Sequence, residues 1–533
     1  MNFYLKTTFR NLRKKPVYSL ISFIGFTFGI LILTFCVSSC SRNKLKTDEN
    51  SLTKQILTEE EQLAREAELR AEREKQLADS LAKLPKGFRF KEDRSVDLQR
   101  PPLVIDIARN LNNIKEIKLS DVATDIKYIR MESLPEAIST TQRFKYYLMD
   151  NNIVAVSLYG IFLFSNDGKF IRNIVKNEFS GISDDETRKA IIIQGDHTFK
   201  GGGTTVWARG NSLFYKYSDN ITGQDYIMEY DCSLNQPTYN IEFDSENQKK
   251  IIGAGEIVFD LKQDNETTNK TQNNLEGAWW IPLDALYNEI KTFAPDKNTY
   301  LKRFWDKVDK IGVFQKNGDT LAVFTNHDQV KDHFSTDSQI QDVGTQYEKN
   351  GSLLFRSDFN DTIFQVVPPN RFLPVYVFNL GRHKYSKQES VDMVSLIDKV
   401  MIKNVAETKN YIFITFTKDN YDCPRNRKNK SVKIYHALFS KSSNQLQIVK
   451  SDPFDYEAPI LVNNIDGGYS IWPLSYQVAS NGEIMLSLKG SDLKTQVKSS
   501  EFQKSAAPAD KKEKLKQLAN SVSDLDDILM IVQ

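Results

Sequence analysis

The sequence is poor in residues that often carry catalysis, with 4 Cys and 5 His among its 533 positions. It contains no Gly-Lys-Ser/Thr phosphate loop, no His-Glu-x-x-His pair and no Gly-x-Ser-x-Gly elbow. It also lacks an excess of charge of either sign, because 71 basic and 69 acidic residues leave a net charge of +2. We therefore expect no nucleic acid partner and no cofactor.

Long apolar runs are also scarce, and the one that stands out lies near the N-terminus. Leu20–Val37 carries no charge and follows a basic head that includes Arg10 and Lys15. This order is typical of an export or membrane signal, and the basic head predicts that everything after it lies outside the cytoplasm. Residues 1–40 are therefore expected to be a signal or anchor segment.

Two interpretations of this segment remain open. Val37-Ser38-Ser39-Cys40 resembles a bacterial lipobox, which would place a lipid on Cys40 after cleavage. Eighteen uncharged residues also reach the lower limit for an uncleaved transmembrane helix. The segment further resembles the first membrane helix of MacB/FtsX-type permeases, at Tyr4–Lys6, Arg10–Leu12 and Tyr18–Leu20.

Residues 41–100 predict a linker that contains one charged helix. Thr58-Glu59-Glu60-Glu61 forms a capping box, and residues 58–84 contain neither Gly nor Pro before Pro85 ends the helix. Arg70 and Glu74 interrupt the heptad spacing of the leucines, which favours a solvated single helix over a coiled coil. We expect this helix to act as a spacer above the membrane.

Residues 101–533 predict an all-β domain. Short stretches of period two alternate with turn signals, as in Ser352–Arg356 followed by Thr362–Val367. Asn317-Gly318 and Asp167-Gly168 mark tight hairpin turns. Helices are expected only at 283–295, 298–308, 387–400 and 507–522. Such a series of hairpins suits a β-propeller or two packed β-sandwiches.

Several segments resemble the six-bladed β-propeller lipoproteins of Bacteroidota. These segments are Leu119–Ile129, Phe164–Ile171, Phe355–Phe364, Pro374–Gly381, Asn464–Gly468 and Trp472-Pro473. The resemblance covers about residues 100–533. It implies a six-bladed propeller with a few inserted helices, export and a lipid anchor, and it brings no established reaction or catalytic residue.

Candidate binding residues are aromatic or lie near turns. Trp279, Trp280 and Trp472 could stack on a sugar or a partner chain, and Asp466 precedes Gly467-Gly468. Core packing is the competing interpretation for each tryptophan.

Two further groups of residues could bind ions. His327, Asp328, Asp332 and His333 could bind a divalent metal, or they could form an ordinary polar loop. A basic run from Arg425 to Lys433 could contact an anionic glycan or a lipid headgroup, or it could simply be solvated. Cys232 and Cys423, the remaining cysteines outside the N-terminal segment, could pair in an oxidising compartment.

Two classes of function fit these observations. The first is a membrane-tethered binding module at the cell envelope, which captures a glycan, a peptide or an envelope protein through its pore or its loops. The alternative is an exported propeller hydrolase or lyase with an active site at the pore. The missing catalytic motifs favour the binding module.

Overall fold

A computed structural model describes residues 59–533 with internal gaps. The gaps are 135–143, 158–159, 177–205, 219–224, 234–239, 244–248, 253–254, 262–291, 304–308, 326, 328–344, 350, 358, 393, 457–459 and 480. The predicted anchor and Cys40 therefore lie outside the described residues. Within the described part, no helix has both the length and the apolar character needed to cross a membrane.

The chain divides into two compact units, Met1–Glu72 and Arg73–Gln533. Helix α3 (Glu59–Leu81) begins in the first unit and ends in the second. In the second unit, Leu77, Leu81 and Leu84 pack into a hydrophobic core formed by the strands, and Leu81 is only 4% exposed. The expectation of a wholly solvated helix is wrong for this part, because the spaced leucines bury their side chains instead of facing water.

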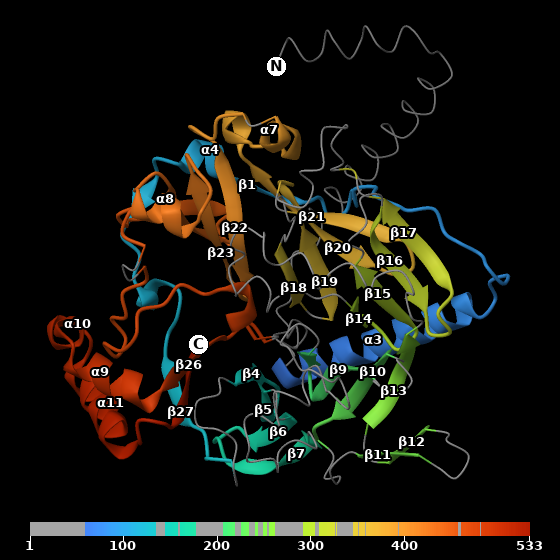
Figure 1. Ribbon diagram of the computed structural model, residues 1–533, viewed down its shortest axis with the longest axis horizontal. Coiled ribbons are helices and arrows are strands. Elements are labelled where there is room, and N and C mark those ends of the chain that lie inside the picture. Colours follow the sequence, from blue (N-terminus) through green and yellow to red (C-terminus); the bar gives the residue numbers. More distant parts are fainter. Residues whose placement is uncertain are drawn as a thin grey trace, which may run out of the picture. The chain divides into compact units, whose positions relative to one another are not determined.

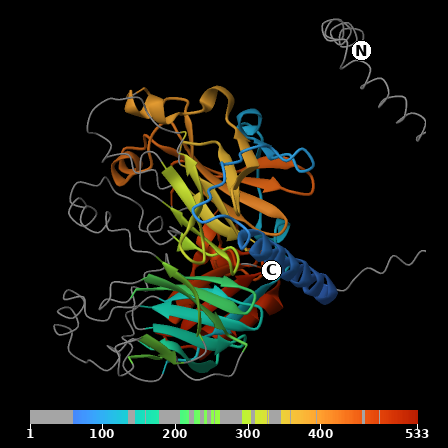
Figure 2. The ribbon, with the colours of Figure 1, turned by 90° about the vertical axis from the view of Figure 1, so that its right-hand side faces the viewer.

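Three antiparallel sheets form the first half of the second unit, and Figure 2 shows them in teal, green and yellow tones. The first contains β4 (Lys145–Leu148), β5 (Asn152–Ser157), β6 (Gly160–Ser165) and β7 (Phe170–Lys176). The second contains β8 (Val206–Arg209), β9 (Ser212–Ser218), β10 (Asp225–Asp231) and β13 (Gly255–Leu261), while β11 (Asn240–Phe243) and β12 (Lys249–Ile252) form a separate ribbon. The third contains β14 (Thr292–Phe293), β15 (Thr299–Arg303), β16 (Asp309–Gln315) and β17 (Thr320–Thr325).

Three further sheets follow, and each includes one strand from residues 103–130 (Figure 1). The fourth contains β18 (Thr345–Lys349), β19 (Ser352–Arg356), β20 (Thr362–Val367), β21 (Arg371–Asn379) and the parallel β1 (Leu103–Asp106). The fifth contains β22 (Val400–Glu407), β23 (Tyr411–Lys418), β24 (Lys433–Ser440), β25 (Gln445–Val449) and the parallel β2 (Ile114–Lys115). The sixth contains β26 (Ile484–Lys489), β27 (Asp527–Val532) and β3 (Ile126–Arg130), which pairs antiparallel with β27.

Five hydrophobic cores lie between these sheets. One joins the first sheet to the second, and another joins the second, third and fourth. A third core joins the fourth and fifth sheets, a fourth joins the fifth and sixth, and a fifth joins the sixth to the first. Strand β23 shows how one strand contributes to two cores. Its Ile412 and Ile414 enter one core, while Phe413 enters the next. Side chains alternate across a strand, so a strand that is apolar on both faces holds two neighbouring sheets.

Apart from the 23-residue helix α3, helices are short and few among the described residues, so the predicted all-β class is confirmed. They are α4 (Ile107–Asn110), η1 (Leu119–Asp121), η5 (Gly381–His383), α7 (Lys387–Val391), α8 (Pro424–Lys428), η6 (Ser475–Gln477), α9 (Gly490–Lys498), α10 (Ser500–Lys504) and α11 (Ala509–Ser521).

Only one of the four expected helices agrees closely with the structure. The helix expected at 507–522 is α11, and α7 covers only the start of the one expected at 387–400. The helix expected at 298–308 is wrong for residues 299–303, because Tyr300 and Leu301 are buried in strand β15 there; residues 304–308 lie outside the described residues. The one expected at 283–295 lies mostly outside the described residues.

Candidate functional site

The structure describes three of the predicted site residues, His327, Asp466 and Trp472. Trp279, Trp280, Asp328, Asp332 and His333 lie outside the described residues. The other predicted metal ligand, His327, is exposed, with its Nε2 3.3 Å from Oε1 of Glu92. In the described ranges, no three His, Cys, Asp or Glu side chains are grouped to hold a metal ion. Both Cys232 and Cys423 are free thiols, and burial raises the pKa of Cys232 to about 12.

Trp472 lies against the face of the fifth sheet. Its Nε1 donates to Oγ1 of Thr415 at 2.9 Å, and its ring meets the rings of Phe413 and His436 edge-on at centroid distances of 5.2 and 5.0 Å. Burial lowers the pKa of His436 to about 4, so this histidine is neutral at pH 7. These contacts favour a packing role for Trp472.

Asp466 is buried in a tight turn and is 5% exposed. Its Oδ1 accepts hydrogen bonds from Nδ2 of Asn463 at 2.7 Å and from the backbone N–H of Gly468 at 2.8 Å. Burial raises the pKa of Asp466, although these hydrogen bonds and the nearby Tyr128 hydroxyl oppose that effect. A side chain at Gly468 would meet the Tyr128 hydroxyl at 2.6 Å, so the turn requires glycine there. This geometry favours a structural role for Asp466.

A more accessible polar surface lies at one end of the fourth and fifth sheets. It consists of residues 380–399, which connect β21 to β22, and residues 418–433, which run from the last residue of β23 to the first residue of β24. Because β22, β23 and β24 are antiparallel neighbours, both connections lie at the same end of the fifth sheet. We call this surface the loop platform (Figure 1).

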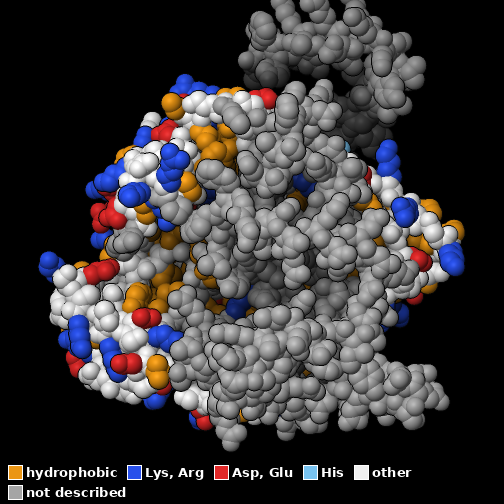
Figure 3. Space-filling view, in the orientation of Figure 1, with side chains coloured by type: hydrophobic (Ala, Val, Ile, Leu, Met, Phe, Trp, Pro, Cys, Tyr) orange, Lys and Arg blue, Asp and Glu red, His pale blue; other side chains and the backbone are white. Residues whose placement is uncertain are grey.

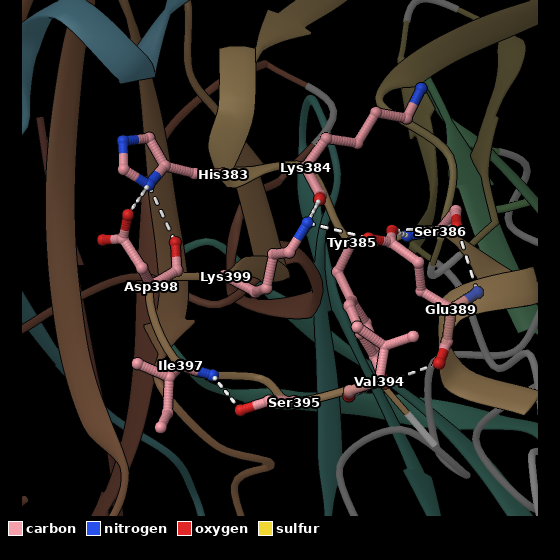
Figure 4. A network of polar contacts seen from close by, with 10 residues as sticks. All are labelled: His383, Lys384, Tyr385, Ser386, Glu389, Val394, Ser395, Ile397, Asp398 and Lys399. Carbon is pink, nitrogen blue, oxygen red and sulfur yellow. Dashed lines mark hydrogen bonds and ion pairs between the residues drawn. The ribbon is translucent and has the colours of Figure 1, made fainter. Parts of the chain in front are cut away.

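The first connection is held by a capping box and a lysine. Ser386 caps α7, because its Oγ accepts from the backbone N–H of Glu389 while the Glu389 carboxylate accepts from the backbone N–H of Ser386. The ammonium of Lys399 reaches both Oε1 of Glu389 and the carbonyl oxygen of Lys384, at 2.8 and 2.9 Å (Figure 4). The hydrogen bond from Lys399 lowers the pKa of Glu389, so the Glu389 carboxylate is ionised at pH 7.

Asp398 links the two connections of the loop platform. His383 Nδ1 lies 2.7 Å from its carbonyl oxygen and 3.2 Å from its carboxylate (Figure 4). The carboxylate also accepts from Lys418 at 2.6 Å, and this hydrogen bond lowers its pKa. The backbone N–H of Asp398 donates to Oδ1 of Asp419, whose Oδ2 pairs with Lys433 at 2.7 Å. Asp398 has a φ of 65°, so these contacts fix a backbone conformation that few non-glycine residues adopt.

The second connection is held around Arg427. Its guanidinium makes two hydrogen bonds to Asp422, at 2.6 and 2.8 Å, and lies 5.4 Å from the ring centroid of Tyr456. The Tyr421 hydroxyl is 2.7 Å from Oγ of Ser390 on α7, which joins this connection to the first. The loop platform is therefore ordered by contacts between its two connections as well as within each.

The exposed surface of the loop platform combines apolar and basic side chains. Ile397 is 76% exposed and Val394 is 41% exposed, and Figure 4 shows the Ile397 side chain pointing away from the polar network. The platform contains ten Lys and Arg but five Asp and Glu, a net charge of +5 compared with +2 for the whole chain. Figure 3 shows Lys and Arg side chains gathered beside hydrophobic ones on this flank.

A contrasting polar cluster lies at the opposite end of the fifth sheet. The carboxylate of Glu407, with a side chain 1% exposed, accepts from the hydroxyls of Tyr347 and Tyr376 at 2.9 and 2.5 Å. The ammonium groups of Lys349 and Lys441 also bind it. Burial alone would raise the pKa of Glu407, but the two ammonium groups outweigh burial and lower it. This cluster joins the fourth sheet to the fifth.

Part of the loop platform was visible in the sequence. The basic run from Arg425 to Lys433 was recognised, but residues 380–399 were not, because 387–400 was expected to be one helix. The available signals were the Ser386-x-x-Glu389 capping box and the apolar residues Val394 and Ile397 beyond the end of a short helix.

Together, the sheets and the loop platform define an all-β protein whose ordered connections present a basic and apolar surface. The chain belongs to the family described as a domain of unknown function (DUF4933), which matches residues 85–499. No curated protein matches the chain.

Solved structures resemble the chain only distantly. A Bacteroides fragilis protein described as exported is 13% identical, with a TM-score of 0.40, and the match covers 81% of this chain and 99% of that one. A Bacteroides caccae protein of unknown function is 10% identical over 59% of this chain and 84% of that one, with a TM-score of 0.22. The Neurospora crassa Pan2 WD40 domain is 8% identical over 61% of this chain and 71% of its own, with a TM-score of 0.26. Because these TM-scores are low, the fold is defined by the sheets of this chain itself.

Proposed function

We propose that this protein is an exported six-bladed β-propeller that acts as a ligand-binding or protein-binding module at the cell envelope. The proposed fold is supported by the order of the cores, which join six successive sheets and then join the sixth sheet to the first. In a propeller, sheets repeat around an axis and only short strand edges remain exposed.

The pairing of β3 with β27 also supports a closed ring. Ile129 lies opposite Leu529, and Ile126 lies opposite Val532, so the strand that leads into the first sheet shares the sixth sheet with the last strand of the chain. Both Ile129 and Leu529 enter the core shared with the first sheet. An arrangement of this kind ties the two ends of a ring together with hydrogen bonds and buried apolar area.

The loop platform is the observation that carries the proposed binding function. Ordered loops on a rigid scaffold commonly carry recognition, because the scaffold fixes their conformation before the partner arrives. Exposed apolar side chains next to charged ones are typical of interaction surfaces. Ile397 and Val394 provide the apolar contribution, and the platform's surplus of cations provides the charge.

The test is a glycan and peptide array probed with the full chain and with a Val394→Ser, Ile397→Ser variant. We expect the variant to bind its ligand at least ~10-fold more weakly, since each exposed apolar contact contributes on the order of 1 kcal/mol. The matched control is Leu525→Ser, since Leu525 is 59% exposed outside the platform. Equal binding by all three proteins, or no ligand on the array, would overturn the proposal.

We also propose that residues 1–40 direct export and that Cys40 carries the lipid that anchors the protein. The support is the uncharged run Leu20–Val37 followed by Val37–Cys40. A Cys40→Ala variant should lose lipid labelling and be released from the membrane fraction. If the variant stays in the membrane fraction, an uncleaved helix is the anchor and the lipid proposal is wrong.

A further inference from the structure

Four cations of the loop platform make no ion pair with a residue that the structure describes. One is Lys387 on α7, which is half-buried, and the other three lie together on a single segment. Arg425 and Lys428 lie on α8, and Lys430 lies in the turn that follows; all three are exposed. None of them makes an ion pair with a residue that the structure describes. The neighbouring Arg427 and Lys433, in contrast, form ion pairs with Asp422 and Asp419. The exposed cations of the platform that form no ion pair with a described residue are therefore concentrated on one short segment.

This segment is ordered without the help of its exposed cations. Pro424 begins α8, and the backbone N–H groups of Arg427 and Asn429 donate to the carbonyl oxygens of Cys423 and Arg425. Nδ2 of Asn426 donates to the carbonyl oxygen of Tyr421 at 2.7 Å. The three cations thus project from a fixed backbone, which reduces the entropy that a bound ligand would have to remove.

We propose that Arg425, Lys428 and Lys430 bind an acidic polysaccharide that carries carboxylate or sulfate groups. Arg425 and Lys428 are three residues apart on a helix, so their side chains are neighbours on one face. A polyanion gains free energy at such a row by releasing its condensed counterions. The proposal rests on the proposed function, which places this surface outside the cytoplasm at the cell envelope.

The composition of α8 favours a polysaccharide over an anionic membrane. Helices that bind membrane surfaces insert an apolar face between the headgroups. The α8 sequence is Pro-Arg-Asn-Arg-Lys, which offers no such face. Contacts to this helix are therefore limited to charge and hydrogen bonds, as the carboxylates, sulfates and hydroxyls of a glycan require.

The experiment measures binding of the full chain to polygalacturonate and to dextran sulfate, with neutral dextran as the uncharged probe. The test variant is Arg425→Gln, Lys428→Gln, Lys430→Asn, in which Asn tolerates the φ of 50° at position 430. The control variant is Lys498→Gln, Lys504→Gln, Lys514→Gln, which removes the same charge from exposed positions on α9, α10 and α11. Unfolding curves check that both variants are folded.

We expect the test variant to bind at least one polyanion roughly 10- to 100-fold more weakly, and the control to bind as the unmodified chain does. The slope of the logarithm of affinity against the logarithm of salt concentration should fall by about 2 in the test variant. Equal losses in both variants, or no polyanion binding, would overturn the proposal.

A vesicle-binding measurement distinguishes lipid headgroups from polysaccharides as the source of the anionic groups. Binding to phosphatidylglycerol vesicles that depends on the three residues, without binding to either polysaccharide, would also overturn the proposal. If the chain binds no polyanion but the Val394→Ser, Ile397→Ser variant still binds its array ligand more weakly, the inference about polysaccharides fails and the proposed binding function stands.

Discussion

Glu407 and Asp466 are both buried carboxylates, but their surroundings compensate their charge in different ways. Glu407 contacts two ammonium groups and two phenol hydroxyls, and its pKa is lowered. Asp466 contacts an amide, a backbone N–H and a nearby phenol, all of them neutral, and its pKa is raised. At Glu407 the fold therefore requires the negative charge itself. At Asp466 it requires only a side chain of the same shape with an oxygen that accepts hydrogen bonds.

The largest expected effect comes from making the same isosteric change at both positions. Glu407→Gln should lower the free energy of unfolding by about 3 kcal/mol, because it leaves Lys349 and Lys441 beside a neutral amide. This value is at the lower end of the destabilisation expected for breaking a buried ion pair, because both ammonium groups are partly exposed to solvent. Asp466→Asn should change it by no more than about 1 kcal/mol, because the Asn oxygen still accepts from Asn463 and Gly468.

Urea unfolding of the two variants and the unmodified chain measures this difference. Tyr376→Phe serves as a partial version of the Glu407 change, since it removes one hydroxyl and should cost about 1 kcal/mol. If Glu407→Gln and Asp466→Asn destabilise the protein equally, charge compensation does not distinguish the two sites.

A smaller effect is expected from pH. Glu407 has a folded pKa below its ordinary value of 4.5, so its contribution to stability is complete above 4.5 and is lost as pH falls through the folded pKa. Asp466 has a folded pKa above its ordinary value of 3.8, so its ionised form is disfavoured and the fold gains stability as pH falls through that raised value.

The two variants separate these opposite trends. From pH 7 towards pH 3, the stability gap between the unmodified chain and Glu407→Gln should narrow. Over the same range, the unmodified chain should gain stability relative to Asp466→Asn. Unfolding free energies at several pH values test both slopes, and parallel curves for all three proteins would show that neither acid titrates differently when folded.

The sequence predicted local features of the fold better than long-range ones. Strands β19 and β20 begin and end where alternation and turn residues indicated, because those signals lie within a few residues. The parallel additions of β1 and β2 were not predicted, since they depend on pairing with strands far along the chain. Tyr300 and Leu301 in β15 were assigned to a helix because a short apolar run fits either period.

The two buried acids show that sites, too, are predicted from the sequence only where their signals are local. Asp466 stood out because glycines follow it, and the glycines do mark a close approach, to the Tyr128 hydroxyl. Glu407 did not stand out, because Lys349, Tyr376 and Lys441 come from three separate strands or turns. A charge becomes recognisable as buried and compensated only when the fold has brought its partners together.

The smallest effect on global stability is expected in the loop platform, where the ion pairs are half-buried or exposed. Lys399→Met removes the cation that holds Glu389 and the carbonyl oxygen of Lys384, and it should lower the unfolding free energy by about 1 kcal/mol or less. The local consequence should be larger than the global one, because residues 384–399 depend on this contact for their order. Amide hydrogen exchange in that segment should therefore accelerate while exchange in β22 and β23 stays unchanged.

Lys494→Met is the matched control, because it removes the exposed pair with Asp524 and should leave exchange in residues 384–399 as it is. Uniform acceleration across the fifth sheet would show that Lys399 supports the sheet as Lys441 does. Acceleration confined to residues 384–399 would show that ion pairs at one end of the sheet order a surface, while those around Glu407 hold two sheets together. In that case, weaker ligand binding by Lys399→Met at unchanged global stability would connect the order of the platform to recognition, since a disordered loop must be fixed again each time it binds.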